Sequence, residues 1–259
     1  MNIVVLLKVV PDVVEELEIA GDGKALDTEV LRMIPSEPDD HSVEQALLLK
    51  ERHGGTVTVA ALDAPDVDDA LYHALACGAD RVLKIQGAPE NCGTTQAAAI
   101  FAEALRSAPG LREADLFLTG VQAIDDLDGL LGPLVAMHLG LPFLGIVTGI
   151  SMDASAHRLR AKREYPGGVH GEFDVNLPAV LGVQAAEQPP RYVPVAKVRA
   201  AMKTQKIGVA DTKAPPAREL LKVVVMRKPE SATHAEMLEG SVEQVSAQLC
   251  GMLSERGLV

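Results

Sequence analysis

The chain of 259 residues has few aromatic side chains and no tryptophan. Aromatic residues make up 3% of it, so the stacking platforms on which single-stranded nucleic acid is bound are largely missing. Basic residues are also in the minority, with Lys+Arg 24 against Asp+Glu 36 and a formal net charge of -12. Non-specific attraction to nucleic acid or anionic lipid is therefore not expected. These deficits favour proteins or small molecules as partners.

Cysteine is scarce and is not spaced for metal or disulfide chemistry. The three cysteines, Cys77, Cys92 and Cys250, are far apart and form no Cys-x-x-Cys pair. This pattern argues against a disulfide framework or a zinc knuckle, and it predicts a reduced, cytoplasmic setting. The seven histidines are scattered without metal-ligand spacing, so we expect no metal site.

Long apolar runs are also missing, and no segment reaches the length of a membrane span. Residues 1–8 are apolar but lack the basic lead and the small-residue cleavage site of a signal peptide. We therefore interpret residues 3–9 as a first buried strand and expect no direct membrane insertion. With 47% apolar residues the chain can bury a sizeable core, built from Ala, Val and Leu.

Strand and helix patterns alternate over the first half of the chain. Further apolar runs typical of buried strands lie at 56–62, 81–85 and 116–119. Helical spacing between them lies at 40–52, 66–77, 94–107 and about 129–139. We expect Asp66 to cap the second of these helices and Gly78 to end it. The alternation predicts an α/β fold with a largely parallel sheet and flanking helices.

The pattern changes in the second half of the chain. Short segments joined by turns predict a small antiparallel section, with strands at 147–153, 158–165 and 169–175. Residues 179–183 return to the apolar run of a central strand. Prolines follow, so we expect an extended arm from 188 to about 228 rather than core. A last amphipathic helix is predicted at 241–256, with Ser241 as its cap.

The segment 114–137 carries the strongest functional signal. It runs from a strand through Thr119 and Gly120 into a polar turn and then into a helix. This order places backbone N–H groups and a helix N-terminus at the carboxyl end of a strand, where open α/β sheets bind nucleotides. A tight structural connection explains the same glycines equally well. Asp126 and Asp128 are poor neighbours for a phosphate because like charges repel, and Asp128 is also a plausible helix cap.

Three passages, taken in order, resemble the β subunit of electron transfer flavoproteins. They are Cys77-Gly78-Ala79-Asp80-Arg81, Gly120-Val121-Gln122-Ala123-Ile124-Asp125-Asp126, and Pro190-Arg191-Tyr192 after Leu177-Pro178-Ala179-Val180. Their order and spacing match over nearly the whole chain. The resemblance implies a fold related to adenine-nucleotide hydrolases and a heterodimer with an α subunit that makes most of the FAD contacts. With the change of pattern after residue 187, it predicts an α/β nucleotide-binding-like domain, 1–187, and an extended partner-recognition and α-subunit-wrapping arm with a terminal helix, 188–259.

The resemblance also implies a nucleotide site in this chain, holding AMP in common members of the family and a second FAD in electron-bifurcating ones. The matching cofactor-binding positions are Leu6, Ser36, Asp39, Leu62, Gly120, Gln122, Ala123, Ile124, Asp125, Gly129 and Gly132. Leu6 and Leu62 are equally explained as core residues. The family's phosphate-contacting Thr, Gln or Asn residues correspond here to Leu127, Asp128, Gly129, Leu130 and Leu131. We expect the adenine end to survive and the phosphate end to be weakened, which leaves AMP, a second FAD or neither.

The Pro-Arg-Tyr passage resembles the loop that seats partner dehydrogenases. Two prolines are expected to hold the backbone extended and to present side chains outward. The docking residues that we predict are Arg191, Tyr192, Val195, Lys197 and Arg199. They combine an apolar anchor with a basic rim, although a surface loop without function is the alternative.

The implied function is that of an electron-transfer subunit without a catalytic site of its own. Such a subunit scaffolds the FAD-bearing α subunit and docks a donor dehydrogenase and an acceptor oxidoreductase. A nucleotide-binding sensor or stress-type module of the same fold is the alternative, but it requires a Gly-rich phosphate loop that the turn after Gly120 lacks.

Overall fold

The computed structural model describes residues 1–28, 31–89, 92–153, 158–213, 222–229 and 237–258. Within these residues the main sheet contains β1 (Asn2–Leu7), β4 (Thr56–Leu62), β5 (Arg81–Gln86), β6 (Leu116–Gly120), β7 (Phe143–Asp153), β8 (Arg158–Tyr165), β9 (Val169–Asn176), β10 (Ala179–Val183) and β11 (Gly208–Asp211). A separate hairpin pairs β2 (Val9–Pro11) with β3 (Met33–Pro35). The helices are α1 (Glu37–His53), α2 (Val67–Cys77), α3 (Thr94–Ser107), α4 (Leu131–Leu139), α5 (Val195–Thr204), α6 (Val242–Glu255) and the 3-10 turn η1 (Pro166–Gly168).

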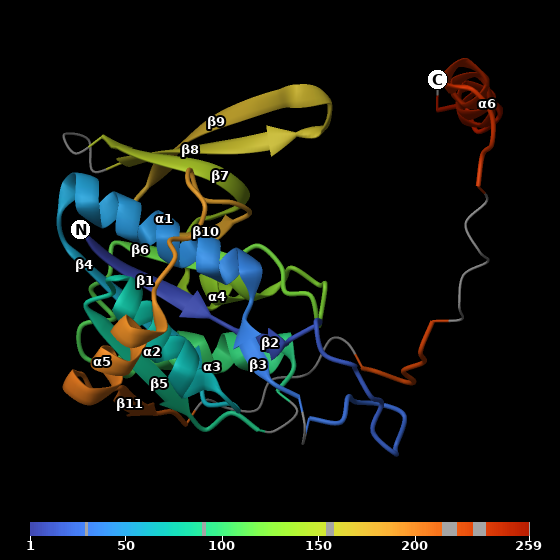
Figure 1. Cartoon of the computed structure of the whole chain (residues 1–259). Helices are drawn as coiled ribbons and strands as arrows, with labels where there is room; N and C mark the ends of the chain where they lie inside the picture. The colour runs from blue at the N-terminus through green and yellow to red at the C-terminus, as the bar shows by residue number, and fades with distance from the viewer. Residues whose placement is uncertain (29–30, 90–91, 154–157, 214–221, 230–236, 259) are drawn as a thin grey trace.

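The main sheet is largely parallel, as the alternating pattern predicts. Its strand order is β11-β5-β4-β1-β6-β10-β7-β8-β9. Every neighbouring pair from β11 to β7 is parallel, whereas β7, β8 and β9 pair antiparallel. The predicted α/β fold with a small antiparallel section is therefore confirmed, and Figure 1 shows the antiparallel strands at one end of the molecule.

Helices cover both faces of the parallel strands, and alternate residues of β1 divide between the two layers. Val5 packs in a core cluster with α1 and α2 residues such as Leu47 and Leu71. Leu6 belongs to the opposite cluster, with α3 and α4 residues such as Phe101. Burial of both faces explains why these strands read as nearly continuous apolar runs.

The order of the strands also defines where a ligand site is expected. β1 lies at the centre, with β4 on one side and β6 on the other. Chain connections leave β1 and β6 in opposite directions along the sheet, so the crevice beside their carboxyl ends is a topological switch point. The turn after Gly120 lies at this edge.

Part of the expected extended arm is regular structure instead. The prediction of extended backbone from 188 to about 228 is wrong over 195–211, where α5 packs against α2 and β11 adds to the sheet beside β5. Pro189, Pro190 and Pro194 precede the helix rather than interrupt it, and Pro215 and Pro216, which also suggested an arm, lie outside the described residues. Pro194 is the N-cap of α5, where its missing N–H removes no intrahelical hydrogen bond. The division of the chain at residue 187 remains a prediction.

Helix ends follow the sequence at Gly78 and Ser241 and depart from it at Asp66. Gly78 ends α2 with φ 133, as expected. Ser241 begins α6, and its side chain and that of Gln244 form a reciprocal capping box. Asp66, however, makes no side-chain cap to α2; its carboxylate instead accepts a hydrogen bond from the N–H of Met33 at 2.9 Å.

The terminal helix α6 stands apart from the sheet and its covering helices (Figure 1). None of its residues is buried. Within the part of the chain that the structure describes, no helix combines the length and the apolar character needed to cross a membrane.

Candidate functional site

The site at the switch point is built around the carboxylate of Asp39, in the first turn of α1. Its Oδ1 accepts a hydrogen bond from the N–H of Gly120 at 2.6 Å, and its Oδ2 accepts one from the N–H of Lys8 at 2.9 Å. A Cβ on Gly120 would lie 2.6 Å from Oδ1 of Asp39 and 2.9 Å from Cβ of Pro38. Glycine is required here because α1 approaches the end of β6 too closely for any side chain.

Burial dominates the protonation of this acid. Asp39 is 3% exposed, and burial raises the pKa of its carboxyl group to about 7, although the two backbone hydrogen bonds oppose the rise. Burial also raises the pKa of its neighbour Asp40 to about 6. Two acids with raised pKa values therefore lie at the N-terminus of α1.

Lys8 follows β1 directly and is held by two carboxylates of the turn. Its Nζ lies 2.7 Å from Oδ1 of Asp125 and 2.6 Å from Oδ2 of Asp126. Burial lowers the pKa of Lys8, but the charges and hydrogen bonds of the two aspartates outweigh this and raise it. The ammonium group is therefore charged and already neutralised within the protein.

The second half of the turn, residues 126–130, is stabilised by hydrogen bonds between its own backbone and its own side chains. Oδ1 of Asp126 accepts a hydrogen bond from the N–H of Asp128 at 3.3 Å, and Oδ1 of Asp128 accepts one from the N–H of Leu130 at 2.9 Å. These are local Asx turns. Asp128 does not cap α4 as proposed from the sequence, because the helix begins at Leu131 and its N-cap is Leu130.

A cavity of about 650 Å³ opens beside this turn. Its volume is within the range of small-molecule sites. Its lining is largely apolar and includes Leu7, Leu62, Ala64, Phe101 and Leu131. It lies where the parallel strands end, as a ligand site of an open α/β sheet should.

A much smaller hollow lies against the turn itself. Its volume is about 20 Å³, close to the minimum that holds one water molecule. Lys8, Asp126 and Leu131 line both the hollow and the cavity, so the two spaces meet at these residues.

Most of the predicted cofactor-binding residues lie at this edge of the sheet, but some line the hollow or the cavity and others are packed in the core. The hollow is lined by Asp39, Gly120, Gln122, Ala123 and Gly129, and the cavity by Leu62. Core or packing positions are held by Leu6, which is fully buried, and by Gly132, which lies against Phe143 and Thr119. Ser36 is buried with no hydrogen-bond partner for its hydroxyl group, Ile124 is exposed, and Asp125 pairs with Lys8.

Sequence reasoning missed Lys8, the cation at the centre of the cluster, and Phe101, which reaches the cavity from α3. A signal for Lys8 was present, because it is the first charged residue after the apolar run of β1. Phe101 carries no such signal. Within the described residues no group of three or more His, Cys, Asp or Glu side chains is arranged to hold a metal ion.

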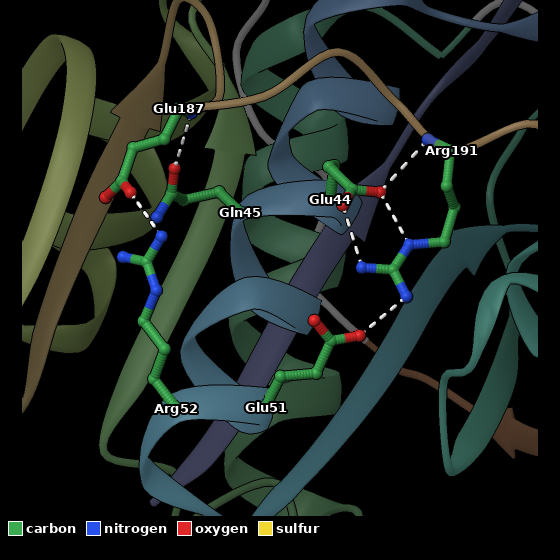
Figure 2. A network of polar contacts seen from close by, with 6 residues as sticks. All are labelled: Glu44, Gln45, Glu51, Arg52, Glu187 and Arg191. Atoms are coloured by element: carbon green, nitrogen blue, oxygen red, sulfur yellow. Dashed lines mark hydrogen bonds and ion pairs between the residues drawn. The ribbon is translucent and has the colours of Figure 1, made fainter.

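The predicted docking segment is attached to α1 by a polar network, which Figure 2 shows from close by. The guanidinium of Arg191 donates to both carboxylate oxygens of Glu44, each at 2.8 Å, and to Oε1 of Glu51 at 2.7 Å. The N–H of Arg191 also donates to Glu44 at 3.1 Å. These contacts raise the pKa of Arg191, chiefly through the Glu44 hydrogen bond. The expected outward orientation is therefore wrong for Arg191, because two carboxylates of α1 hold it inward.

A second attachment lies four residues earlier in the chain. Oε2 of Glu187 accepts a hydrogen bond from Arg52 at 2.6 Å, and the N–H of Glu187 donates to Oε1 of Gln45 at 3.1 Å (Figure 2). Together with Arg191, Glu187 fixes both ends of the 187–191 segment on α1.

The residues after Arg191 present the features expected of a docking surface. Tyr192 is 86% exposed and Val195 is exposed at the start of α5, whereas Val193 between them is buried. Lys197 and Arg199 are exposed on the same helix. The structure thus places an aromatic ring, an apolar side chain and two cations near one another in the chain, at the end of the fixed segment.

Comparison with known proteins finds relatives of this chain by sequence. The sequence profile of the family described as Electron transfer flavoprotein domain matches residues 25–217. The electron transfer flavoprotein subunit beta of Clostridium acetobutylicum is 32% identical over 82% of this chain and 79% of its own length. The subunit of the same name from Methylophilus methylotrophus is 29% identical over 98% of both chains. That of Thermoanaerobacterium thermosaccharolyticum is 28% identical over the whole of both. The chain therefore belongs to the electron transfer flavoprotein β-subunit family.

Proposed function

We propose that this electron-transfer protein acts as the β subunit of a heterodimer, in which it scaffolds an FAD-bearing α subunit and docks redox partners. Electrons then pass from a donor dehydrogenase through the flavin to an acceptor oxidoreductase. The chain itself has a structural and docking role, without a catalytic residue of its own. Its proposed setting is the cytoplasm, as the cysteine pattern predicts.

The observation that carries this proposal is the apolar stripe of α6, which no other element covers in the part of the chain that the structure describes. Val242, Leu249, Met252 and Leu253 are exposed, and their spacing places them on one side of the helix. A 14-residue helix is marginal on its own in water, and most helical stability comes from packing of an apolar face. A second chain that receives this stripe in a groove supplies that packing.

The segment after Arg191 supports a second contact, with redox partners. Tyr192 and Val195 offer an exposed apolar anchor, and Lys197 and Arg199 a positive rim on a chain of net charge -12. Such a surface favours a partner with an acidic rim around an apolar pocket. Arg191 contributes by fixing the segment on α1 rather than by contacting the partner.

The sensor-module alternative receives no comparable support. In the turn after Gly120, the N–H groups of Asp128 and Leu130 donate to the carboxylates of Asp126 and Asp128, and the hollow beside the turn has room for about one water molecule.

The test is co-expression of the full chain with its cognate α chain, followed by size-exclusion chromatography and flavin analysis. We expect a yellow 1:1 complex with one FAD in the α subunit. Leu249→Glu with Leu253→Glu should weaken association by about tenfold or more, because charge enters the apolar stripe. Ala247→Glu, on the opposite side of α6, is the matched control. A colourless chain that ignores every cognate α chain would contradict the proposal.

A further inference from the structure

Backbone N–H groups at the candidate nucleotide site already donate hydrogen bonds to side chains of the protein. The N–H groups of Gly120 and Lys8 both donate to Asp39, and the N–H of Leu130 donates to Asp128. Pro133, in the first turn of α4, has no N–H. A helix N-terminus binds phosphate through such donors, so this one has few left to offer.

The charge at the same place is negative. Asp126 and Asp128 line the hollow, and the cation among its lining residues, Lys8, is already paired with Asp125 and Asp126. A phosphate group arriving here meets carboxylates before it meets a free positive charge, and like charges repel.

The available volume also favours an uncharged group over a phosphate group. The apolar cavity of about 650 Å³ is large enough for a nucleoside, whereas the hollow against the turn, at about 20 Å³, is too small for a phosphate group. Lys8 and Asp126 stand at the junction of the two. The residues present therefore fit an uncharged ring system and do not fit a nucleotide with its phosphate.

We propose that the cavity of this chain binds a neutral purine nucleoside and discriminates against its phosphorylated forms. The ion pairs of Lys8 with Asp125 and Asp126, together with the Asp39 hydrogen bonds, take the bridging role between β1, α1 and the turn that a bound phosphate would otherwise have. The nucleoside class rests on the proposed function, because the resemblance to the β subunit implies a nucleotide site at this place in the chain. The discrimination against phosphate rests on the contacts of this chain.

The first measurement compares adenosine with AMP on the full-length chain, alone and with its α chain, by calorimetry at one fixed salt concentration. We expect adenosine to bind about tenfold or more tightly than AMP, a preference of about 1.4 kcal/mol. Acid extraction of the purified protein should release no stoichiometric AMP and no flavin beyond the one FAD of the α subunit.

The second measurement tests the origin of the preference. Asp126→Asn with Asp128→Asn removes two negative charges, while the amide oxygens still accept the local hydrogen bonds and Asp125 still pairs with Lys8. The ratio of AMP to adenosine affinity should rise about tenfold. The control Glu113→Gln removes one exposed charge before β6, at the opposite end of that strand, and should leave the ratio unchanged.

Several outcomes would overturn the proposal: stoichiometric AMP or a second FAD in the purified protein, AMP binding as tight as adenosine, binding of neither compound, or an unchanged ratio in the double variant. The experiments can support or contradict this inference independently of the proposed function. A chain that selects adenosine but ignores α chains supports only the inference, and a heterodimer that retains AMP supports only the function.

Discussion

The N–H of Gly120 donates to the carboxylate of Asp39 across 2.6 Å and so ties the end of β6 to the start of α1. The same carboxylate holds the N–H of Lys8 after β1. One buried side chain thus connects the two strands of the switch point, although the three residues are far apart in the sequence. Changes at this contact should affect stability before they affect any partner.

The stability of the protein should fall as pH rises from about 4 to about 7. Asp39 and Asp40 have pKa values of about 7 and about 6 in the folded chain, whereas an unfolded aspartate titrates near 3.9. Between these values the native state binds more protons than the unfolded state, so each unit of pH lowers the free energy of unfolding. Above about pH 7 this contribution is constant.

Asp39→Asn should flatten that slope and leave only the part due to Asp40. Urea denaturation at several pH values between about 4.5 and 7.5 measures it. Asp63→Asn, at an exposed position, is the control and should keep the wild-type slope. An Asp39→Asn protein with the full slope would show that another group is responsible.

Gly120→Ala should destabilise the chain by about 1–3 kcal/mol, the usual cost of forcing extra atoms into a packed site. The added methyl group would lie 2.6 Å from Oδ1 of Asp39, so α1 must move. Gly21→Ala, where a Cβ meets nothing within 4 Å, is the matched control and should change stability by about 0.5 kcal/mol or less. Equal effects of the two substitutions in chemical denaturation would contradict the packing argument.

Lys8→Met should destabilise the turn because it leaves Asp125 and Asp126 without their shared cation. All three side chains are about a quarter to a third exposed, so we expect a loss of about 1 kcal/mol rather than that of a fully buried pair. A double-mutant cycle with Asp126→Asn should give a coupling that shrinks as salt is added. A coupling energy of zero at low salt would show that the Lys8–Asp126 ion pair does not stabilise the protein.

Arg191→Lys should release the docking segment while leaving the core folded. Lysine cannot reproduce the paired hydrogen bonds to Glu44, whose side chain is only 5% exposed. We expect a loss of about 2 kcal/mol, discounted because Arg191 itself is partly exposed, and faster amide exchange over residues 187–194. Arg199→Lys, at an exposed position of α5, should leave amide exchange unchanged. Exchange that is equally slow in both variants would contradict the anchoring role of Arg191.

Local patterns predicted the parallel sheet well, because strands such as β4 and β10 are buried on both faces and their apolar runs follow directly from that burial. They failed at α5 and β11, where prolines near 190 suggested an extended arm. Helix formation there depends on packing against α2 and strand formation on pairing with β5, and both are contacts between distant parts of the chain.

Some residues of the candidate site could be predicted from the sequence and others could not. Gly120 and the acidic turn were visible in the sequence because each has a local signature. The Lys8 cluster and the inward orientation of Arg191 were not, because each depends on a partner more than a hundred residues away. Charges in a sequence show how many ions must be paired, but the fold decides which ones meet.

β11 is the outermost strand at one end of the sheet and lies beside β5. Its pairing with β5 covers a row of backbone N–H and C=O groups that would otherwise be open to another chain. β11, which follows the docking residues in the chain, is four residues long, so it replaces the six-residue edge of β5 with a shorter one. Short edge strands limit edge-to-edge aggregation. A shortened protein that ends before residue 208 should lose solubility during folding, even if every residue of the nucleoside cavity is still present.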